Sequence, residues 1–389
     1  MQYRRFGKLD WAVSALGFGA MRLPTIGSDP HQSKVDEAEA IRMVRRAIDA
    51  GVNYVDTAYS YHNGEGEVIV GKALRDGYRG RVKLATKSPV WMIKSEADFD
   101  RFLDEQLKKL QTDTIDCYLL HAIASKSWNG GVRNNNLLKR AEAAKKDGRI
   151  RHFGFSFHDD NKAFLEILTG YDAWDFCQIQ YNYIDIENQA GTAGLKTASK
   201  RGLAVIVMEP LLGGRLANPP ATIRKMMEPA WSGTPADLAL QWIWDQPEVS
   251  TVLSGMSAMP QVEENLASAK RSGIGSLNDA QQAMVAGVRK AYAKSAPIPC
   301  TNCGYCMPCP TNVNIPQNFQ LYNDIFMHQN AEFPRFVYKA FVPEPTRASA
   351  CAACKECEEL CPQQITISEW MPKVDDLLAD TAPVRFSAG

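Results

Sequence analysis

The chain has 389 residues, of which 45% are hydrophobic and 23% charged, as in folded proteins with a full core, and its length predicts two domains. Because 44 lysines and arginines balance 44 aspartates and glutamates, the net charge is zero, and we expect no nucleic acid and no anionic membrane surface as a partner. No run reaches the roughly 18 apolar residues of a membrane span, and no apolar segment follows the charges of Met1–Phe6, so we expect neither a membrane span nor a secretion signal.

The first predicted element is a β-hairpin, followed by alternating strands and helices. Tyr3–Phe6 and Trp11–Ala15 flank the turn sequence of the hairpin, which we expect to close the floor of the domain that follows. Helical patterns such as Ala38–Ala50 and Phe99–Leu110 then separate short apolar runs. The eight runs predicted as strands are Leu16–Phe18, Val52–Val55, Val82–Ala85, Ile115–Leu120, His152–Phe155, Phe176–Ile179, Ala204–Val207 and Thr251–Leu253.

Strands that alternate with helices predict an α/β fold with a parallel sheet and right-handed crossovers. Eight such units within roughly 250 residues favour a closed (β/α)8 TIM barrel. An open, doubly wound sheet is the alternative, but the first turn, Gly17–Met21, lacks the glycine fingerprint of open dinucleotide-binding folds. After the barrel, Ser276–Asp279 predicts a capping box and a helix to about Lys294. Prolines follow, and we place the domain boundary there: residues 1–296 and residues 297–389.

Four polar side chains follow three neighbouring strands of the predicted barrel. Asp56 and Tyr61 follow the second strand, Lys87 the third and His121 the fourth. The carboxyl ends of barrel strands meet at one mouth, so we expect these groups to converge. Each residue alone has an ordinary structural explanation, such as a turn cap, a rim aromatic, a solvated amine or a core histidine. Their combination favours an active site.

The four groups suit the reduction of a carbonyl. A free tyrosine, with a pKa of about 10, donates its proton poorly near neutrality, and we expect the ammonium group of Lys87 to lower the pKa of Tyr61. Asp56 would hold Lys87 in place, and a neutral His121 would donate a hydrogen bond to the carbonyl oxygen.

These segments resemble the aldo-keto reductase family over residues 3–295. The resemblance rests on Gly51–Ala58 with Tyr61, Ala85–Lys87, Asp116–His121, Gly154–Ser156, Gln178, Glu209–Leu211, Ser254–Ser257 and Glu263–Asn265. It implies that Asp56, Tyr61, Lys87 and His121 form the catalytic tetrad of an NAD(P)-dependent oxidoreductase, with Tyr61 as general acid/base. The implied activity is the reversible reduction of an aldehyde, ketone or sugar-like carbonyl. The implied small-molecule partner is therefore a carbonyl compound or its alcohol.

The same resemblance implies where NADP or NAD binds. The implied cofactor residues are Met21, Ser156, Gln178, Met208, Leu211, Ser254, Ser257, Gln261, Glu264 and Asn265. Gln261, Glu264 and Asn265 look like the branch that contains potassium-channel β subunits. Because Gln261 stands where the aldose reductase branch usually has an arginine for the 2′-phosphate, the choice between NADP and NAD stays open.

Eight of the ten cysteines follow residue 299. Their two-residue gaps are typical of iron–sulfur ligation in a reducing compartment, and we expect a cytoplasmic protein. In two-cluster ferredoxins the fourth cysteine of each motif ligates the other cluster. That rule assigns one [4Fe–4S] cluster to Cys300, Cys303, Cys306 and Cys361, and a second to Cys351, Cys354, Cys357 and Cys309.

The cysteine-rich stretch, about residues 297–370, resembles bacterial two-cluster ferredoxin domains. Its first motif has two rather than three residues between Cys306 and Cys309, so a single cluster and structural zinc stay open as alternatives. In the barrel, Cys117 and Cys177 lie in apolar strand runs and are expected to be buried.

The iron–sulfur domain leaves two further functions open. A hydride carries two electrons together, whereas each cluster accepts one, so direct transfer from NAD(P)H to the clusters would need a flavin-like mediator, for which the sequence shows no motif. If physiological electrons nevertheless pass through the clusters, the protein would be a ferredoxin-linked electron-transfer oxidoreductase with a redox carrier protein as partner. Alternatively, the barrel could serve as a slow-turnover module that senses nicotinamide nucleotides.

Overall fold

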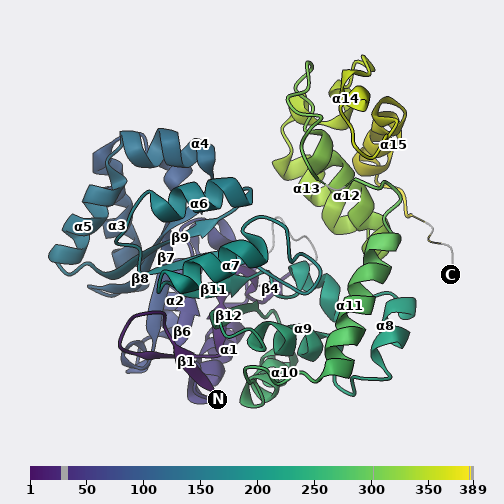
Figure 1. The fold of residues 1–389 in the computed structure, drawn as a ribbon. Coiled ribbons are helices and arrows are strands. Elements are labelled where there is room, and N and C mark those ends of the chain that lie inside the picture. The colour runs from purple at the N-terminus through teal and green to yellow at the C-terminus, as the bar shows by residue number, and fades with distance from the viewer. Residues whose placement is uncertain (28–33, 301, 385, 387–389) are drawn as a thin grey trace. The chain divides into compact units, whose positions relative to one another are not determined.

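The computed structural model describes residues 1–27, 34–300, 302–384 and 386 of the chain (Figure 1). The chain divides into two compact units, Met1–Ala217 with Gly233–Asn278 and Asn218–Ser232 with Asp279–Gly389. The first unit holds the alternating strands and helices, and the second holds the cysteine motifs. Among the helices of the described residues, none combines the length and the hydropathy that a membrane crossing needs.

The first unit is a closed barrel of parallel strands, in the order β10-β11-β12-β3-β6-β7-β8-β9. Each run predicted as a strand overlaps one of them, so the predicted TIM barrel is confirmed. The strands are β3 (Leu16–Gly19), β6 (Tyr54–Asp56), β7 (Lys83–Ser88), β8 (Ile115–Ile123), β9 (Ile150–Phe157), β10 (Phe176–Gln180), β11 (Ala204–Met208) and β12 (Val249–Gly255). Two short strands, β4 (Thr25–Ile26) and β5 (Lys34–Val35), pair with each other outside the barrel.

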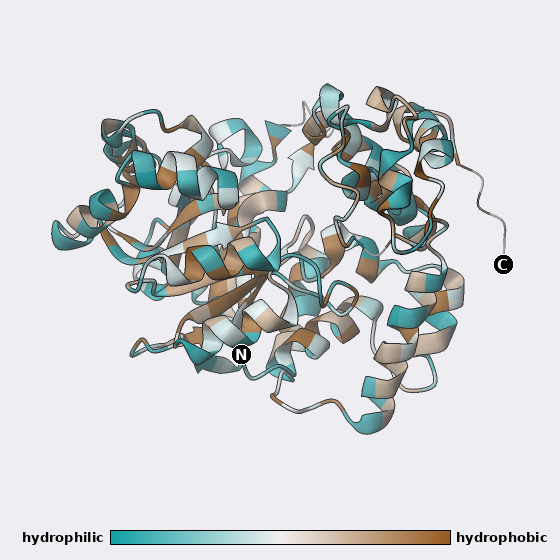
Figure 2. Cartoon of the chain, turned by 45° about the horizontal axis from the view of Figure 1, so that its top comes forward, coloured by the Kyte–Doolittle hydropathy of each residue, from teal (hydrophilic) through white to brown (hydrophobic). Residues whose placement is uncertain are grey.

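Helices connect the strands because amphipathic segments with local start signals lie between them. The Asp36 side chain accepts a hydrogen bond from the backbone of Glu39 at the start of α1, and Ser95 and Asp98 form a capping box at the start of α3. Figure 2 shows the hydrophobic colour on the barrel strands, whereas the helices carry bands of both hydrophilic and hydrophobic colour. The helices are α1 (Glu37–Asp49), α2 (Gly66–Ala73), α3 (Glu96–Leu110), α4 (Ser125–Ser127), α5 (Leu137–Lys146), α6 (Asn161–Thr169), α7 (Gly191–Lys200), α9 (Pro235–Trp244) and α10 (Met259–Lys270).

The N-terminal hairpin closes the floor of the barrel, as predicted. Strands β1 (Tyr3–Arg5) and β2 (Ala12–Ser14) pair in antiparallel fashion. Phe6 is fully buried, and its ring lies 5.9 Å from that of Tyr54 and 5.7 Å from that of Phe176. Gly7 has a φ of +57°, and a Cβ atom there would lie 2.3 Å from the backbone nitrogen of Ala204, so only glycine lets the turn approach so closely.

The second unit is helical and packs around a core of its own. Its helices are α8 (Ala221–Met227), α11 (Asp279–Lys294), α12 (Ile315–His328), α13 (Glu332–Phe341), α14 (Glu356–Glu359) and α15 (Ile367–Ala379). Phe319, Ile325, Met371 and Val374 are buried in this core, against which several cysteines pack. The predicted helix that ends near Lys294 is confirmed as α11. The division of the chain into domains of residues 1–296 and 297–389 stays a prediction.

Candidate active site and cysteine site

The four side chains of the predicted tetrad lie together at one end of the barrel. Asp56 ends β6, Lys87 lies near the end of β7, His121 lies near the end of β8, and Tyr61 begins the short helix η2 (Tyr61–Gly64). In the sheet, Asp56 pairs with Ala85. The adjacent strands β6, β7 and β8 therefore bring three of the groups to the mouth, and η2 supplies the fourth.

Lys87 is the centre of this arrangement. Its side chain is 1% exposed, and its Nζ donates to Oδ1 of Asp56 at 2.7 Å and to the backbone oxygen of Thr57 at 2.7 Å. The third contact of Nζ is the phenolic oxygen of Tyr61 at 3.3 Å. Three contacts match the three donors of an ammonium group, so the buried charge is satisfied and its direction is fixed.

The pKa values follow from burial and from this ion pair. Burial lowers the pKa of Lys87, but Asp56 and Tyr61 outweigh it and the pKa is raised, so the amine stays charged. Burial raises the pKa of Tyr61, and the opposing charge of Lys87 only partly offsets that effect. The expectation that Lys87 makes the phenol more acidic than free tyrosine is therefore wrong for this structure, because desolvation of the phenolate dominates.

His121 is a neutral imidazole beside the phenol. Burial, followed by the charge of Lys87, holds the pKa of His121 well below its usual range. Its ring centre lies 6.0 Å from that of Tyr61 and 5.0 Å from that of Trp91. Nδ1 of His121 is buried without a hydrogen-bond partner among the described residues. The imidazole is thus uncharged and available to a ligand in the mouth.

Trp91 is a site residue that sequence reasoning missed. It lies in the short helix η4 (Val90–Met92) just after β7, and 56% of its surface is exposed. The signal was present, because residues just after barrel strands line the mouth. Trp128, by contrast, is fully buried, with its ring 6.2 Å from that of Trp174, so it is an interior residue.

Two predicted cofactor residues present polar atoms that suit a carboxamide group. Gln178 is 2% exposed; its Nε2 donates to the sulfur of Met208 at 3.4 Å, and its Oε1 is buried without a partner among the described residues. The hydroxyl of Ser156 accepts a hydrogen bond from the backbone of Ala122 at 2.7 Å, which leaves its own hydrogen free to donate. An acceptor and a donor of this kind fit the two ends of a nicotinamide carboxamide.

The remaining predicted cofactor residues lie around η1 (Ala20–Arg22), the loop after β11, the end of β12 and the start of α10. Hydrogen bonds fix the residues near β12 and α10. Nδ2 of Asn265 donates to Ser254 at 2.9 Å, the backbone of Ser257 donates to Gln261 at 2.8 Å, and Glu264 accepts from Thr234. Met21 is 55% exposed in η1, and Leu211 directly precedes η6 (Leu212–Ala217).

Sequence reasoning also missed a buried polar network behind the tetrad, formed by Glu67, Thr86, Gln106 and Tyr118. A glutamate in the first turn of a helix is usually solvated, so the sequence carried no sign of its burial.

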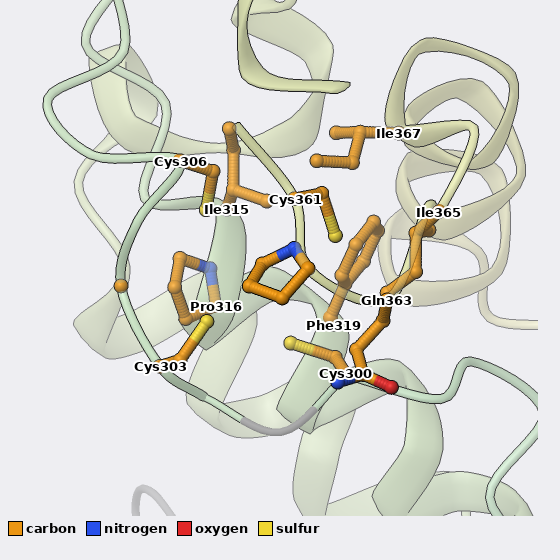
Figure 3. Close-up of a pocket in the computed structure, with 12 residues that line it drawn as sticks. Cys300, Cys303, Cys306, Ile315, Pro316, Phe319, Cys361, Gln363, Ile365 and Ile367 are labelled. Atoms are coloured by element: carbon orange, nitrogen blue, oxygen red, sulfur yellow. The ribbon is translucent and has the colours of Figure 1, made fainter. Parts of the chain in front are cut away.

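Four cysteines line one pocket of the second unit, which is partly open to solvent. They are Cys300, Cys303, Cys306 and Cys361, and Figure 3 shows their sulfur atoms directed at the shared space, with Ile315, Phe319, Ile365 and Ile367 around it. Burial, followed by the neighbouring thiols, raises the pKa of Cys306 to about 11. Four thiols from two distant motifs in an apolar setting fit an iron–sulfur cluster, and they are the set that the sequence assigned to one cluster.

The other four cysteines lie in different settings. Burial tends to raise the pKa of Cys309, but hydrogen bonds from Thr311 and from the backbone of residues 311–313 outweigh it and lower the pKa. Cys357 is buried, whereas Cys354 is exposed. In the barrel unit, Cys117 and Cys177 are fully buried, as predicted.

Comparisons with known proteins match both parts of the chain to known families. The model of the aldo/keto reductase family matches residues 15–280, and that of the 4Fe-4S dicluster domain matches residues 299–366. The 6-dehydroglucose reductase of Novosphingobium aromaticivorans is 31% identical over 238 residues, which are 56% of this chain and 71% of that protein. The L-galactose dehydrogenase of Arabidopsis thaliana is 27% identical over 287 residues, which are 69% of this chain and 88% of that protein.

Solved structures share the barrel. An aldo/keto reductase from Klebsiella pneumoniae in complex with NADPH matches with a TM-score of 0.59 and 25% identity, covering 74% of this chain and 95% of that chain. The likeness to the potassium-channel β-subunit branch stays a prediction. The extent of the family match and the closed barrel lead to one conclusion: this chain is an oxidoreductase that belongs to the aldo/keto reductase family, and a 4Fe-4S dicluster domain follows its barrel.

Proposed function

We propose that the protein reduces a small carbonyl compound with NAD(P)H, reversibly, with Tyr61 as the proton donor. The observation that carries this proposal is the buried ammonium group of Lys87, held by Asp56 and directed at the phenol of Tyr61. The amide of Gln178, whose oxygen has no hydrogen-bond partner in the described part of the chain, adds support for a nicotinamide in the same mouth.

When bound, the reduced nicotinamide would supply a hydride, that is, one proton with two electrons, to the carbonyl carbon. Ser156 and Gln178 would hold its carboxamide, with Met208 beside them, and Ser254, Ser257, Gln261, Glu264 and Asn265 would hold the adenosine end. Met21 and Leu211 would lie along the dinucleotide. The NADPH in the Klebsiella pneumoniae relative supports NADP as the cofactor, with NAD as the alternative.

The chain's own residues supply the proton and the orientation. Tyr61 gives its phenolic proton to the carbonyl oxygen, which becomes the hydroxyl of the alcohol, and solvent later restores that proton. Lys87, 3.3 Å away, stabilises the phenolate that remains, and Asp56 keeps the ammonium group in place. Neutral His121 donates a hydrogen bond to the same carbonyl oxygen and sets its direction.

We further propose a neutral, sugar-like carbonyl as substrate. Trp91 offers an exposed aromatic face on one side of the mouth, beside His121. Polar residues follow the strands on the other side: His158 after β9 and Glu209 after β11. Burial and then the charge of Asp56 raise the pKa of Tyr61, and the charge of Glu209 adds to this rise. The carboxylate of Glu209 therefore acts electrostatically on the phenol. A negative charge at Glu209 disfavours acidic substrates. The names of two relatives, a galactose dehydrogenase and a dehydroglucose reductase, also support a sugar-like substrate.

The test is a panel of neutral and acidic carbonyl compounds with NADPH and NADH, followed by the pH dependence of kcat/KM with the best substrate. Reduction needs protonated Tyr61 and neutral His121. Since the pKa of Tyr61 is raised and that of His121 is lowered, we expect a constant rate through neutral pH. The rate should fall only above pH of about 10, where a tyrosine loses its proton, while oxidation of the alcohol should rise with pH.

A rate of reduction that falls with a midpoint near neutrality would contradict the assignment of Tyr61 as proton donor. Tight nucleotide binding without turnover across the panel would instead favour the slow-turnover sensing module.

The second unit, in this proposal, binds two [4Fe–4S] clusters with the crossed ligand sets. The first set is Cys300, Cys303, Cys306 and Cys361, whose thiols share one pocket, and the second is Cys351, Cys354, Cys357 and Cys309. Support comes from the dicluster family match and from the hydrogen bonds at Cys309. Such ligands need a reducing compartment, so we propose a cytoplasmic location.

Iron analysis of anaerobically purified protein tests the number of clusters. Two cubane clusters correspond to about eight irons per chain, and we expect Cys354→Ser to lower the content to about four, because Cys354 is an exposed ligand of the second cluster only. Matching acid-labile sulfide is expected. Four irons in the unsubstituted protein would support the single-cluster alternative, and zinc without sulfide would exclude both.

A second candidate function is ferredoxin-linked electron transfer with a redox carrier protein, which the dicluster match favours. A cluster-dependent activity that persists in Tyr61→Phe would support it, because one-electron transfer through the clusters needs no proton from the phenol.

A further inference from the structure

A buried carboxylate that the proposed chemistry does not use lies directly behind the tetrad. Glu67 is the second residue of α2 and is fully buried. Burial raises its pKa, although hydrogen bonds from Thr86 and Gln106, and then the charge of Lys109, whose Nζ lies 3.7 Å from Oε2, oppose that rise. Since a buried carboxylate is costly unless its oxygens are bonded, its partners indicate what it does.

The partners of Glu67 connect two helices to two barrel strands. Its Oε1 accepts from the hydroxyl of Thr86 at 2.6 Å and from Nε2 of Gln106, on α3, at 2.5 Å. Nε2 of Gln106 also donates to the backbone oxygen of Lys87 at 3.0 Å, and its Oε1 accepts from the hydroxyl of Tyr118 at 2.7 Å. All four side chains are fully buried.

The network reaches the strands at the level of the tetrad. Thr86 directly precedes Lys87, and it pairs with Tyr118, three residues before His121. The network therefore contacts β7 and β8 on the side that faces the helices, whereas the side chains of Lys87 and His121 lie at the mouth. Gln106 even bonds the backbone of Lys87 itself.

The start of α2, in turn, packs on the turn that bears Tyr61. A Cβ atom on Gly66 would lie 3.0 Å from the backbone oxygen of Tyr61 and 3.1 Å from its Cβ atom. Within this turn, His62 and Asn63 adopt left-handed conformations, with φ of 52° and 55°. Non-glycine residues rarely hold such conformations unless the surroundings fix them. Glu67, one residue after Gly66, bonds this helix start to β7 through the hydroxyl of Thr86.

We infer that Glu67 is a positioning residue that, with Gln106, ties the Tyr61 turn to the Lys87 strand and so sets the distance between the phenol and the ammonium group. This inference rests on the proposed function, since it assigns a role through Tyr61. It concerns a residue that touches neither substrate nor cofactor.

The test uses the full-length, cluster-loaded protein and three substitutions. Glu67→Ala removes the anchor, and we expect kcat for carbonyl reduction to fall about 10²-fold, because a misplacement of about 1 Å is enough for such a loss. KM and the Kd for NADPH should stay within about twofold. The lost interaction matters only in the transition state, so kcat and kcat/KM fall equally. Glu67→Gln keeps an acceptor for Thr86 and should recover most of kcat. Glu65→Ala, in the same segment but exposed, is the matched control and should leave kcat unchanged.

Two readouts separate positioning from a general loss of folded protein. In a Tyr61→Phe background, Glu67→Ala should cause little further loss, because its effect acts through Tyr61. In Glu67→Ala alone, the alkaline limb of the pH profile should move to higher pH, since the phenol loses part of the influence of Lys87. If Glu67→Ala does not fold, Thr86→Val provides the same comparisons, because it removes the hydroxyl that bonds Glu67 to β7.

The inference is overturned if Glu67→Ala keeps the kcat of the unsubstituted enzyme, or if its loss multiplies with that of Tyr61→Phe. Failure of the proposed function looks different: Tyr61→Phe itself would then keep full turnover.

Discussion

Replacing Tyr61 with phenylalanine is expected to lower kcat for carbonyl reduction by about 10²- to 10⁴-fold, the usual contribution of general acid catalysis. The substitution removes the phenolic oxygen, which lies 3.3 Å from Nζ of Lys87. No other described side chain offers a proton donor at that position. The phenyl ring keeps its edge-on packing against His121. The Kd for NADPH, measured by fluorescence titration, and the iron content should therefore stay the same while turnover is lost.

A second tyrosine in the same segment provides the control. Tyr59 also has a bonded hydroxyl, which donates to Glu105 at 2.9 Å, but it has no contact with Lys87 among the described residues. Tyr59→Phe should leave kcat within about twofold, as is usual for substitutions away from buried or reacting groups. The role of Tyr61 is refuted if both variants turn over at the same rate, or if Tyr61→Phe loses its nucleotide affinity together with its turnover.

The barrel and the position of the tetrad could be predicted from sequence because both depend on local patterns. Strands such as Ala204–Met208 are continuous apolar runs, and strands of a closed parallel barrel all deliver their carboxyl ends to one side. Asp56, Lys87 and His121 therefore had to converge once three runs were recognised as neighbouring strands. The cysteine spacing was equally local, and four of the predicted ligands do line a common pocket.

Properties that depend on burial could not be predicted in this way. The pKa of Tyr61 was expected to fall because Lys87 was expected nearby, but the depth of the phenol decides the direction of the shift. The network of Glu67 was invisible for a similar reason, because its partner Gln106 lies 39 residues away in the sequence. Neither residue type nor spacing reports whether a charged side chain faces solvent or another element.

The second large effect concerns the stability of the buried ion pair between Asp56 and Lys87. The two side chains are 3% and 1% exposed, with 2.7 Å between their charged atoms. Removing one member of such a pair leaves an uncompensated charge and typically costs about 3–5 kcal/mol. We therefore expect both Asp56→Asn and Lys87→Met to lower the free energy of unfolding of the barrel by an amount in that range, measured by denaturant titration with tryptophan fluorescence.

The double substitution Asp56→Asn with Lys87→Met should be more stable than either single one, because it removes both charges from the interior. The exposed pair of Arg42 and Glu39, with side chains 62% and 26% exposed, serves as the control and should contribute about 0–1 kcal/mol. If the losses of the two single variants simply add, the charges are not coupled and the pair does not hold Lys87 in place. A double variant that regains stability but has no reductase activity would separate the structural role of the ion pair from its catalytic role. The fold would then tolerate the absence of the ion pair, whereas proton donation by Tyr61 would require the ammonium group that the pair keeps buried.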